Sequence, residues 1–335
     1  MIERLDQFMA QTNRAYYATH DPFSDFTTAP EISQVFGELI GLWCHMVLQT
    51  MGAPDRFALI EAGPGRGTLM SDALRVLEKL APDTLCRSEL HFLETSPRLS
   101  AILRTRFPQA VIHWNAISLP EIPMLLIGNE FLDVLPIRQF VRRASGWAER
   151  YVSKDRWHEE LIDEASLPGP DVINIQLKDA SLGSILEFSE AAHSFTSFVS
   201  RRLVQQVGAA IFFDYGPTQS GFGETLQAIR HGKPTNPLLD PGSADLTAHV
   251  DFDSLSKTAR HFGCSVAGPI PQGAFLSAMG IHERTAQLGR HATVHATQKL
   301  IAATRRLTAT EAMGGLFKAF AITSPTLGQI PGFPG

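Results

Sequence analysis

Apolar residues in the first 130 positions form short runs, which are separated by longer segments of helical spacing. Such runs are typical of buried strands, whereas apolar residues three and four positions apart indicate one face of a helix. The predicted strands are residues 57–60, 90–93, 111–114 and 124–127. Helices are predicted at 69–80 and 96–106. Strands that alternate with helices indicate a parallel sheet covered on both faces.

Another helix is predicted upstream, after a short helix and a loop in residues 1–29. Thr28-Ala29-Pro30-Glu31 has the pattern of a capping box, in which the hydroxyl and the carboxylate each accept a free backbone N–H. Apolar positions then continue at helical spacing, so we expect one helix from this box to Gln49.

The pattern becomes weaker after Pro136, where a hairpin is predicted around Ser145-Gly146. A polar, partly extended insertion follows at 153–180, and residues 216–247 are expected to form a long functional loop. The remaining predictions are helices at 184–206, 252–262 and 274–312, strands at 209–213, 265–267 and 316–322, and a loose C-terminus. With these strands the predicted sheet has seven members.

The composition excludes several classes of protein. Of the 335 residues, 44% are hydrophobic and 19% are charged, which is typical of a globular protein with a sizeable core. A net charge of −5 and basic residues clustered only in pairs make a nucleic acid an unexpected partner. Three widely spaced cysteines fit reduced thiols, and neither a signal peptide nor a membrane span is apparent. We therefore expect a cytoplasmic protein.

The most specific local signal is EAGPGRGTL, from Glu61 to Leu69, between the first strand and its helix. Gly63, Gly65 and Gly67 allow a tight turn and a close approach of backbone to ligand. The spacing differs from G-x-G-x-x-G because Thr68 stands where the third glycine is expected, and this disfavours a nicotinamide dehydrogenase. Acid-x-Gly-x-Gly-x-Gly instead resembles the first motif of the class I methyltransferases, which holds the methionine part of S-adenosylmethionine.

Two further positions are candidates for holding this cofactor. Glu94 ends the second strand, where a carboxylate can accept hydrogen bonds from both ribose hydroxyls. Its alternative role is that of an acid at the start of the next helix. Asn115 and Ala116 follow the third strand, where this fold usually contacts the adenine ring, although an ordinary loop asparagine is equally compatible with the sequence.

After the fourth strand the chain reads GNEFLDVLP, which places Asn129, Glu130 and Asp133 where open α/β sheets bind their ligands. Two carboxylates and an amide at that position can meet a nitrogen nucleophile near a transferable methyl group. The alternative is helix capping by Asn129 and a solvated acid at Asp133. The sequence lacks the Asn-Pro-Pro-Tyr expected of a nucleobase amine methyltransferase at this point.

Seven blocks spread over nearly the whole chain resemble the MidA family of class I S-adenosylmethionine-dependent methyltransferases. They are DFTTAPEISQVFGELIG (25–41), the glycine loop, GNEFLDVLP, FFDYG (212–216), ADLTAHVDF (244–252), QGAFLSAMGI (272–281) and MGGLFKAFAI (313–322). The resemblance implies a Rossmann-like, mostly parallel seven-stranded sheet with helical and loop insertions. It also implies methyl transfer, without a metal, to a protein arginine, with S-adenosylhomocysteine as product and a respiratory complex I subunit as a possible client. A non-catalytic assembly factor that binds the same cofactor is the alternative.

The resemblance further suggests a division of the chain along its length. We expect a helical lid segment at 1–56, the cofactor-binding core at 57–136, an insertion at 137–207 and the remainder of the sheet at 208–335. His249 and Asp251 either line the substrate side or cap the next helix, and Asp214 either faces the pocket or is structural. His291 and His295 have the spacing of a metal pair, but with no third ligand they are expected on a solvated face.

Overall fold

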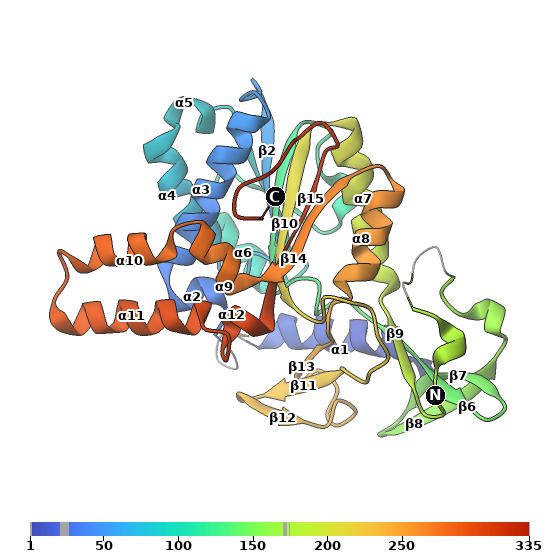
Figure 1. The fold of residues 1–335 in the computed structure, drawn as a ribbon. Coiled ribbons are helices and arrows are strands. Elements are labelled where there is room, and N and C mark those ends of the chain that lie inside the picture. The colour runs from blue at the N-terminus through green and yellow to red at the C-terminus, as the bar shows by residue number, and fades with distance from the viewer. Residues whose placement is uncertain (1, 21–26, 170–172, 174, 335) are drawn as a thin grey trace. The chain divides into compact units, whose positions relative to one another are not determined.

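The computed structural model describes residues 2–20, 27–169, 173 and 175–334. The chain forms two compact units (Figure 1). The core unit consists of Thr27–Phe131, Phe198–Tyr215 and Phe262–Gly335. The inserted unit consists of Met1–Phe26, Leu132–Ser197 and Gly216–His261. In the described residues no helix is long and apolar enough to span a bilayer.

The core unit contains a seven-stranded sheet in the order β14-β15-β10-β5-β2-β3-β4. Its strands are β2 (Phe57–Ala62), β3 (Ser88–Leu93), β4 (Val111–His113), β5 (Met124–Asn129), β10 (Gly208–Tyr215), β14 (Ser265–Pro271) and β15 (Phe317–Thr323). The pairs from β10 to β4 are parallel, whereas β15 pairs antiparallel with both β10 and β14. The predicted mostly parallel, seven-stranded sheet is therefore confirmed.

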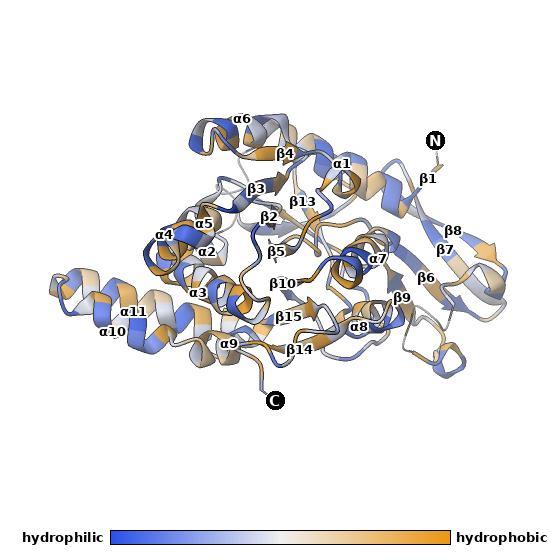
Figure 2. Cartoon of the chain, turned by 90° about the horizontal axis from the view of Figure 1, so that it is seen from above, coloured by the Kyte–Doolittle hydropathy of each residue, from blue (hydrophilic) through white to orange (hydrophobic). Residues whose placement is uncertain are grey.

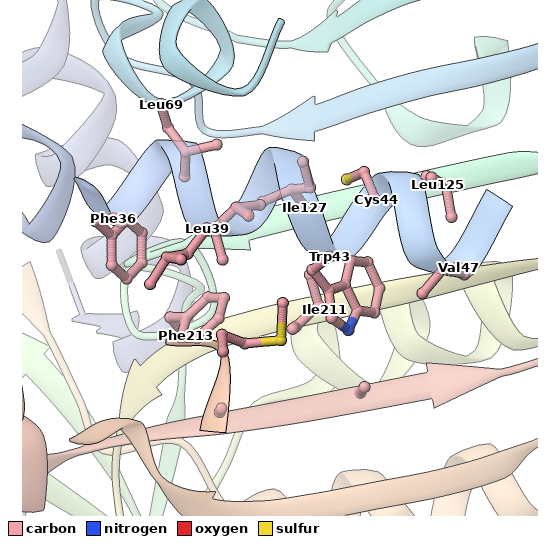
Figure 3. Packing of buried hydrophobic residues seen from close by; sticks show 14 of the residues in the cluster. Phe36, Leu39, Trp43, Cys44, Val47, Leu69, Leu125, Ile127, Ile211 and Phe213 are labelled. Atoms are coloured by element: carbon pink, nitrogen blue, oxygen red, sulfur yellow. The ribbon is translucent and has the colours of Figure 1, made fainter. Parts of the chain in front are cut away.

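One face of this sheet is covered by α3 (Gln34–Thr50), whose apolar side chains enter the main hydrophobic cluster (Figure 3). Phe36 and Trp43 are fully buried there, together with Ile211 and Phe213 of β10. The rings of Phe36 and Phe213 meet edge to face with centroids 5.1 Å apart. Burial of such large side chains supplies most of the attraction between helix and sheet.

The start of this helix differs from the prediction. Thr28 makes no side-chain cap, and a short α2 (Ala29–Ile32) ends at Ser33. The Ser33 hydroxyl accepts the N–H of Val35 at 3.2 Å and begins α3. Glu31 instead accepts a hydrogen bond from Thr68 Oγ1 at 2.6 Å, so its carboxylate is tied to the end of the glycine loop. The predicted capping box was wrong, because the hydrogen bond from Thr68 takes up the Glu31 carboxylate.

The other helices of the core unit are α4 (Thr68–Leu80), α5 (Pro82–Leu85), α6 (Pro97–Arg106), α9 (Gln272–Ala278), α10 (Ile281–Gly289), α11 (Val294–Thr308) and α12 (Met313–Leu316). The strand β15 is largely hydrophobic (Figure 2), and every residue in it except the half-buried Lys318 is buried. The predicted loose C-terminus is wrong, because Leu327, Ile330 and Phe333 belong to the main hydrophobic cluster.

The inserted unit holds two smaller sheets. In the first, β1 (Ile2–Arg4), β7 (Gly146–Ser153), β6 (Arg138–Arg143) and β9 (Ile185–Phe188) are neighbours, and β8 (Arg156–Ile162) pairs with β7. In the second the order is β12 (Lys233–Thr235), β11 (Gln227–Arg230) and β13 (Asp245–Thr247). Its helices include α1 (Leu5–Thr19), α8 (Phe252–His261) and the first part of α7 (Glu190–Gln205).

Two predictions for these segments need correction. The expected loop 216–247 contains the second small sheet, and a strand, β9, precedes the helix predicted from residue 184. The insertion at 153–180 contains the strand β8, in agreement with its predicted partly extended character. The strands β11, β12 and β13 have only three or four residues each. Runs of that length are too short to establish a period of two.

The close contact of α3 and α4 yields a prediction for stability. A Cβ atom at Gly41 would lie 2.6 Å from the carbonyl oxygen of Ala73 in α4. We expect Gly41→Ala to lower the free energy of unfolding by about 1–3 kcal/mol, because the backbones must separate. This exceeds the gain of about 1 kcal/mol in helix propensity. Thermal and urea unfolding would measure it.

Gly289→Ala in α10 is the matched control. Its Cβ would lie 3.3 Å from Cγ2 of Thr297, a side-chain atom that is able to move. We expect this variant to be as stable as the wild type or more so. A Gly41→Ala protein with unchanged stability would contradict the proposed limit on helix separation.

Candidate active site

The glycine loop connects β2 to α4 through three residues of left-handed backbone. Gly63, Gly65 and Gly67 have φ values of 65°, 55° and 73°. A Cβ at Gly67 would also lie 2.5 Å from Cε2 of Phe107. Both the backbone conformation and the space therefore require glycine here. The first N–H groups of α4 follow directly and provide the positive end of a helix dipole.

Glu61 lies one residue before the end of β2 and is 3% exposed. Burial raises the pKa of its carboxyl group from 4.5 to about 8, although the backbone N–H of Met70 partly offsets this effect. Its Oε2 atom is buried and has no hydrogen-bond partner in the described part of the chain. A buried acceptor of this kind is suited to a donor supplied by a ligand.

Glu94 lies beside the glycine loop, because β2 and β3 are paired with Ala62 opposite Leu93. Burial raises the pKa of Glu94 to about 7, and the charge of Glu94 also contributes to the raised pKa of Glu61. Glu94 Oε1 accepts the N–H of Ser96 at 2.7 Å, and Ser96 caps α6. The structure thus bears out the helix-start role and leaves the ribose contact a prediction.

Asn115 and Ala116 follow β4, whose last carbonyl, that of His113, accepts the N–H of Glu94 at 2.9 Å. The loop is therefore fixed next to Glu94. Asn115 is exposed, and its Oδ1 accepts the N–H of Ser118 at 3.2 Å, which closes a short 3₁₀ turn, η2 (Ala116–Ser118). The adenine contact stays a prediction.

Asn129 and Glu130 form a strained turn at the end of β5. Asn129 is 9% exposed, its Nδ2 donates to Glu130 Oε1 at 3.2 Å, and its buried Oδ1 has no partner among the described residues. Glu130 has a φ of 51°, which is uncommon for a residue other than glycine and costs of order 1–3 kcal/mol. Its N–H donates to the carbonyl of Phe213 at 2.8 Å. Such strain is typical of functional sites.

Asp214 stabilises this turn. It is 1% exposed and accepts the N–H groups of Phe131 at 3.1 Å and of Tyr215 at 3.2 Å. The sequence left its role open between pocket and structure. These bonds make Asp214 a positioning residue for the turn, a role that the sequence signals only by an acid at a strand end.

Asp133 belongs to the inserted unit, unlike Asn129 and Glu130. It is 4% exposed and adjoins a cavity of about 280 Å³ within that unit. The cavity is lined by the acids Asp133, Glu187 and Asp251 and by the aromatic rings of Phe188 and Phe222, among other residues. No lysine or arginine is found among its described lining residues.

Two histidines also line this cavity, one buried and one exposed. His193 hydrogen-bonds Thr258 Oγ1 at 2.8 Å and Ser254 Oγ at 2.7 Å, and burial lowers its pKa to about 4, so the ring is neutral and structural. His249 is exposed. Asp251 accepts the N–H of Ser254 at the start of α8, so it both caps the helix and lines the cavity. His291 and His295 are exposed, as expected.

The core unit therefore combines a glycine turn with two buried carboxylates at the ends of adjacent parallel strands. S-adenosylmethionine carries a sulfonium, an ammonium and two ribose hydroxyls, and carboxylates are the natural partners of all of these groups. The unpartnered Oε2 of Glu61 and the left-handed turn at Gly63 and Gly65 fit this chemistry. The fold and site define an α/β protein built to bind a cationic nucleoside cofactor.

The chain belongs to the MidA family of S-adenosyl-L-methionine-dependent methyltransferases, whose family model matches residues 39–270. It is 32% identical to the mitochondrial protein arginine methyltransferase NDUFAF7 homolog of Drosophila melanogaster, with 96% of this chain and 80% of that protein covered. The mouse NDUFAF7 protein is 30% identical over the same shares. The predicted family is confirmed.

Solved structures agree with this assignment. A superfamily member from Burkholderia thailandensis, crystallised with S-adenosyl-homocysteine, is 25% identical and superposes with a TM-score of 0.80 over 99% of this chain and 90% of that one. A second structure from the same organism is 27% identical with a TM-score of 0.81 over the same shares. The protein is a methyltransferase that uses S-adenosylmethionine.

The expected cytoplasmic location is contradicted by these comparisons. The curated relatives from fly, mouse and human are named as mitochondrial proteins. Unpaired cysteines indicate a reducing environment without specifying the compartment, so this sequence signal was insufficient.

Glu94 provides the first test of the site. If its carboxylate accepts the ribose hydroxyls, Glu94→Ala should weaken S-adenosylmethionine binding by about 1.5–3 kcal/mol. A 2′-deoxy analogue should lose less affinity in the variant than in the wild type. Titration calorimetry would measure both, and equal losses in the two proteins would place Glu94 outside the ribose site.

The raised pKa values predict a pH dependence. Glu61 and Glu94 are protonated below about 8 and about 7, whereas the ionised forms accept more strongly from cationic and hydroxyl donors. We therefore expect affinity for S-adenosylmethionine to rise from pH 6 to pH 9, with release of protons on binding. Glu61→Gln should flatten the upper part of this rise. A pH-independent affinity would show that the cofactor does not meet these carboxylates.

The same groups affect the free energy of unfolding without cofactor. Their folded pKa values exceed the ordinary value of 4.5, so the folded state binds more protons between that value and about 8. Their stabilising contribution is complete below 4.5 and is lost as the pH rises through about 7 and about 8. Urea unfolding at several pH values would measure this loss. Glu61→Gln, which cannot ionise at position 61, is the control.

Proposed function

We propose that this protein transfers the methyl group of S-adenosylmethionine to a side-chain nitrogen of arginine in a protein substrate. The observation that carries the proposal is the cavity of the inserted unit, which combines three acids with two aromatic rings and has no lysine or arginine among its described lining residues. The relatives named as protein arginine methyltransferases support the same substrate.

The chemistry of this lining suits a guanidinium group. Arginine is charged at ordinary pH and has only donors, so it requires carboxylates and is stabilised over aromatic faces. Glu187 is held rigidly, because it accepts hydrogen bonds from Gln139 Nε2 at 2.7 Å and from the N–H of Thr225 at 3.0 Å. A fixed carboxylate recognises a forked cation with little loss of side-chain entropy.

In the proposed mechanism the core unit holds the cofactor through Glu61, the glycine loop and Glu94. When bound, S-adenosylmethionine supplies the methyl group as an electrophile. We propose Asn129 and Glu130 of the core unit and Asp133 of the inserted unit as the residues that would orient the guanidinium, since methyl transfer requires the nitrogen to come within about 3–3.5 Å of the methyl carbon. A carboxylate of this set would accept the proton that the nitrogen loses when it takes up the methyl group, and S-adenosylhomocysteine would be the leaving group.

We further propose a respiratory complex I subunit as the first client to test, since the family resemblance implies that target. The four-segment division, with residues 1–56 as a lid, is also retained as a proposal. A protein that binds the cofactor and its client without catalysis is the competing function, and turnover measurements separate the two.

The test begins with the wild type. Incubation of the pure protein with labelled S-adenosylmethionine and host lysate should label a discrete protein, and mass spectrometry should find the methyl group on arginine. Label on lysine or on a nucleic acid would contradict the proposed substrate. Tight cofactor binding with no transfer to any client would favour the assembly factor.

Glu130→Gln and Asp133→Asn then test the carboxylates. Both preserve shape and remove charge, so turnover should fall by about a hundredfold or more, the usual worth of a positioned acid or base. Affinity for S-adenosylmethionine should stay within a few-fold of the wild type. Glu164→Gln, an exposed acid on another surface turn, is the control and should leave turnover unchanged. Full activity in both site variants would make these carboxylates structural.

A further inference from the structure

Two buried histidines in the core unit are connected to the loop that follows β4. His91 on β3 and His113 on β4 are 4% and 7% exposed, respectively. They lie on the same face of neighbouring parallel strands, and His91 Nδ1 is 2.9 Å from His113 Nε2. His113 Nδ1 is in turn 2.7 Å from Ser118 Oγ. Neither histidine has a part in the methyl transfer described above.

These hydrogen bonds form a series from His91 through His113 to Ser118, called the histidine relay below. Their direction follows from the Ser118 end of the series. Ser118 Oγ donates its single hydrogen to the carbonyl oxygen of Asn115 at 2.9 Å, so it must accept from His113. His113 therefore carries its proton on Nδ1. Burial lowers the pKa of both imidazoles below 6.5, so each ring is neutral and has one N–H. His113 Nε2 is then bare and accepts from Nδ1–H of His91.

We propose that His91 and His113 are positioning residues that orient the Asn115–Ser118 turn for recognition of the adenine ring. Ser118 contributes two bonds to Asn115, one from its hydroxyl and one from its backbone N–H. The buried histidine pair fixes the rotation of that hydroxyl and connects it to β3. This four-residue turn, in which Asn115 and Ser118 are exposed, thereby gains the rigidity of the sheet. This inference rests on the proposed adenine site at Asn115 and Ala116.

The Nε2 atom of His91, which makes none of these hydrogen bonds, determines how the histidine relay responds to a fall in pH. His91 Nε2 is buried, has no hydrogen-bond partner in the described residues and lies 3.6 Å from Glu89 Oε2. Glu89 itself pairs with Arg56, and these two groups with His113 are the charges that act on His91. A first added proton binds to Nε2 of His91, which faces Glu89. A second proton on His113 would place two N–H groups face to face and break the relay.

The experiment measures discrimination at the adenine ring. Titration calorimetry would compare S-adenosylhomocysteine with S-inosylhomocysteine, in which the exocyclic amine is replaced by a carbonyl and N1 carries a proton. Wild type should prefer the adenine form by about tenfold or more. Ser118→Ala and His113→Leu should reduce that preference to about threefold or less, the effect of losing one or two neutral hydrogen bonds. His113→Asn, which retains a donor near the position of Nδ1, should recover part of it.

Ser166→Ala is the matched control, because Ser166 is the exposed third residue of another 3₁₀ turn, η3 (Glu164–Ser166). Ser118 is exposed as well, so its variant keeps the test available where a buried histidine variant does not fold. In wild type the preference should also fall as the pH drops well below 6.5. A merely structural role would weaken both ligands equally and leave the ratio unchanged.

The outcomes separate this inference from the function on which it rests. Wild type that binds neither ligand, or binds both equally, would overturn the adenine site itself and the relay with it. Wild type that discriminates, alongside a Ser118→Ala protein that discriminates equally well, would overturn the relay alone. Reduced discrimination in Ser118→Ala and unchanged discrimination in Ser166→Ala would support it.

Discussion

The parallel pairing of β2 with β3 and β5 is the constraint on which the candidate site depends. The register sets Ala62 opposite both Leu93 and Gly128, so the carboxyl ends of three strands lie in one row. Each chain segment leaves the sheet at that row and brings with it the glycine loop, Glu94 or the Asn129–Glu130 turn. The backbone hydrogen bonds between the strands are sufficient to bring these three elements together, so no long-range side-chain contact is needed.

The same arrangement carries an energetic cost that a ligand can remove. Two carboxylates are buried near each other, and each has a pKa well above its ordinary value. Removing charge from water is expensive unless a counter-charge is present. If a cationic cofactor binds beside these carboxylates, as predicted, it would provide that counter-charge, and the site would then favour the charged methyl donor over its demethylated product on electrostatic grounds.

The sequence predicted the sheet well because its strands are nearly uninterrupted apolar runs, as in Phe57–Ile60 and Met124–Ile127. The glycine loop was predicted equally well, because its three left-handed positions favour glycine and therefore leave a visible motif in the sequence. Other features depend on contacts that no local pattern reveals. Glu31 is drawn from its capping role by Thr68, Phe333 is buried by tertiary packing, and Asp214 acts through the backbone of Phe131. His91 and His113 lie 22 positions apart and gave no motif.

The interleaving of the two units has a consequence for biosynthesis. The inserted unit is assembled from three stretches of chain, and its first strand, β1, pairs with β7, with Ile2 opposite Ser153. The N-terminal residues therefore cannot reach their native partners until about 150 further residues have been translated. At roughly 5–20 residues per second this is a delay of about 8 to 30 seconds. During that interval the apolar face of α1, with Leu5, Phe8 and Met9, is without its native cover, which exposes it to non-native contacts.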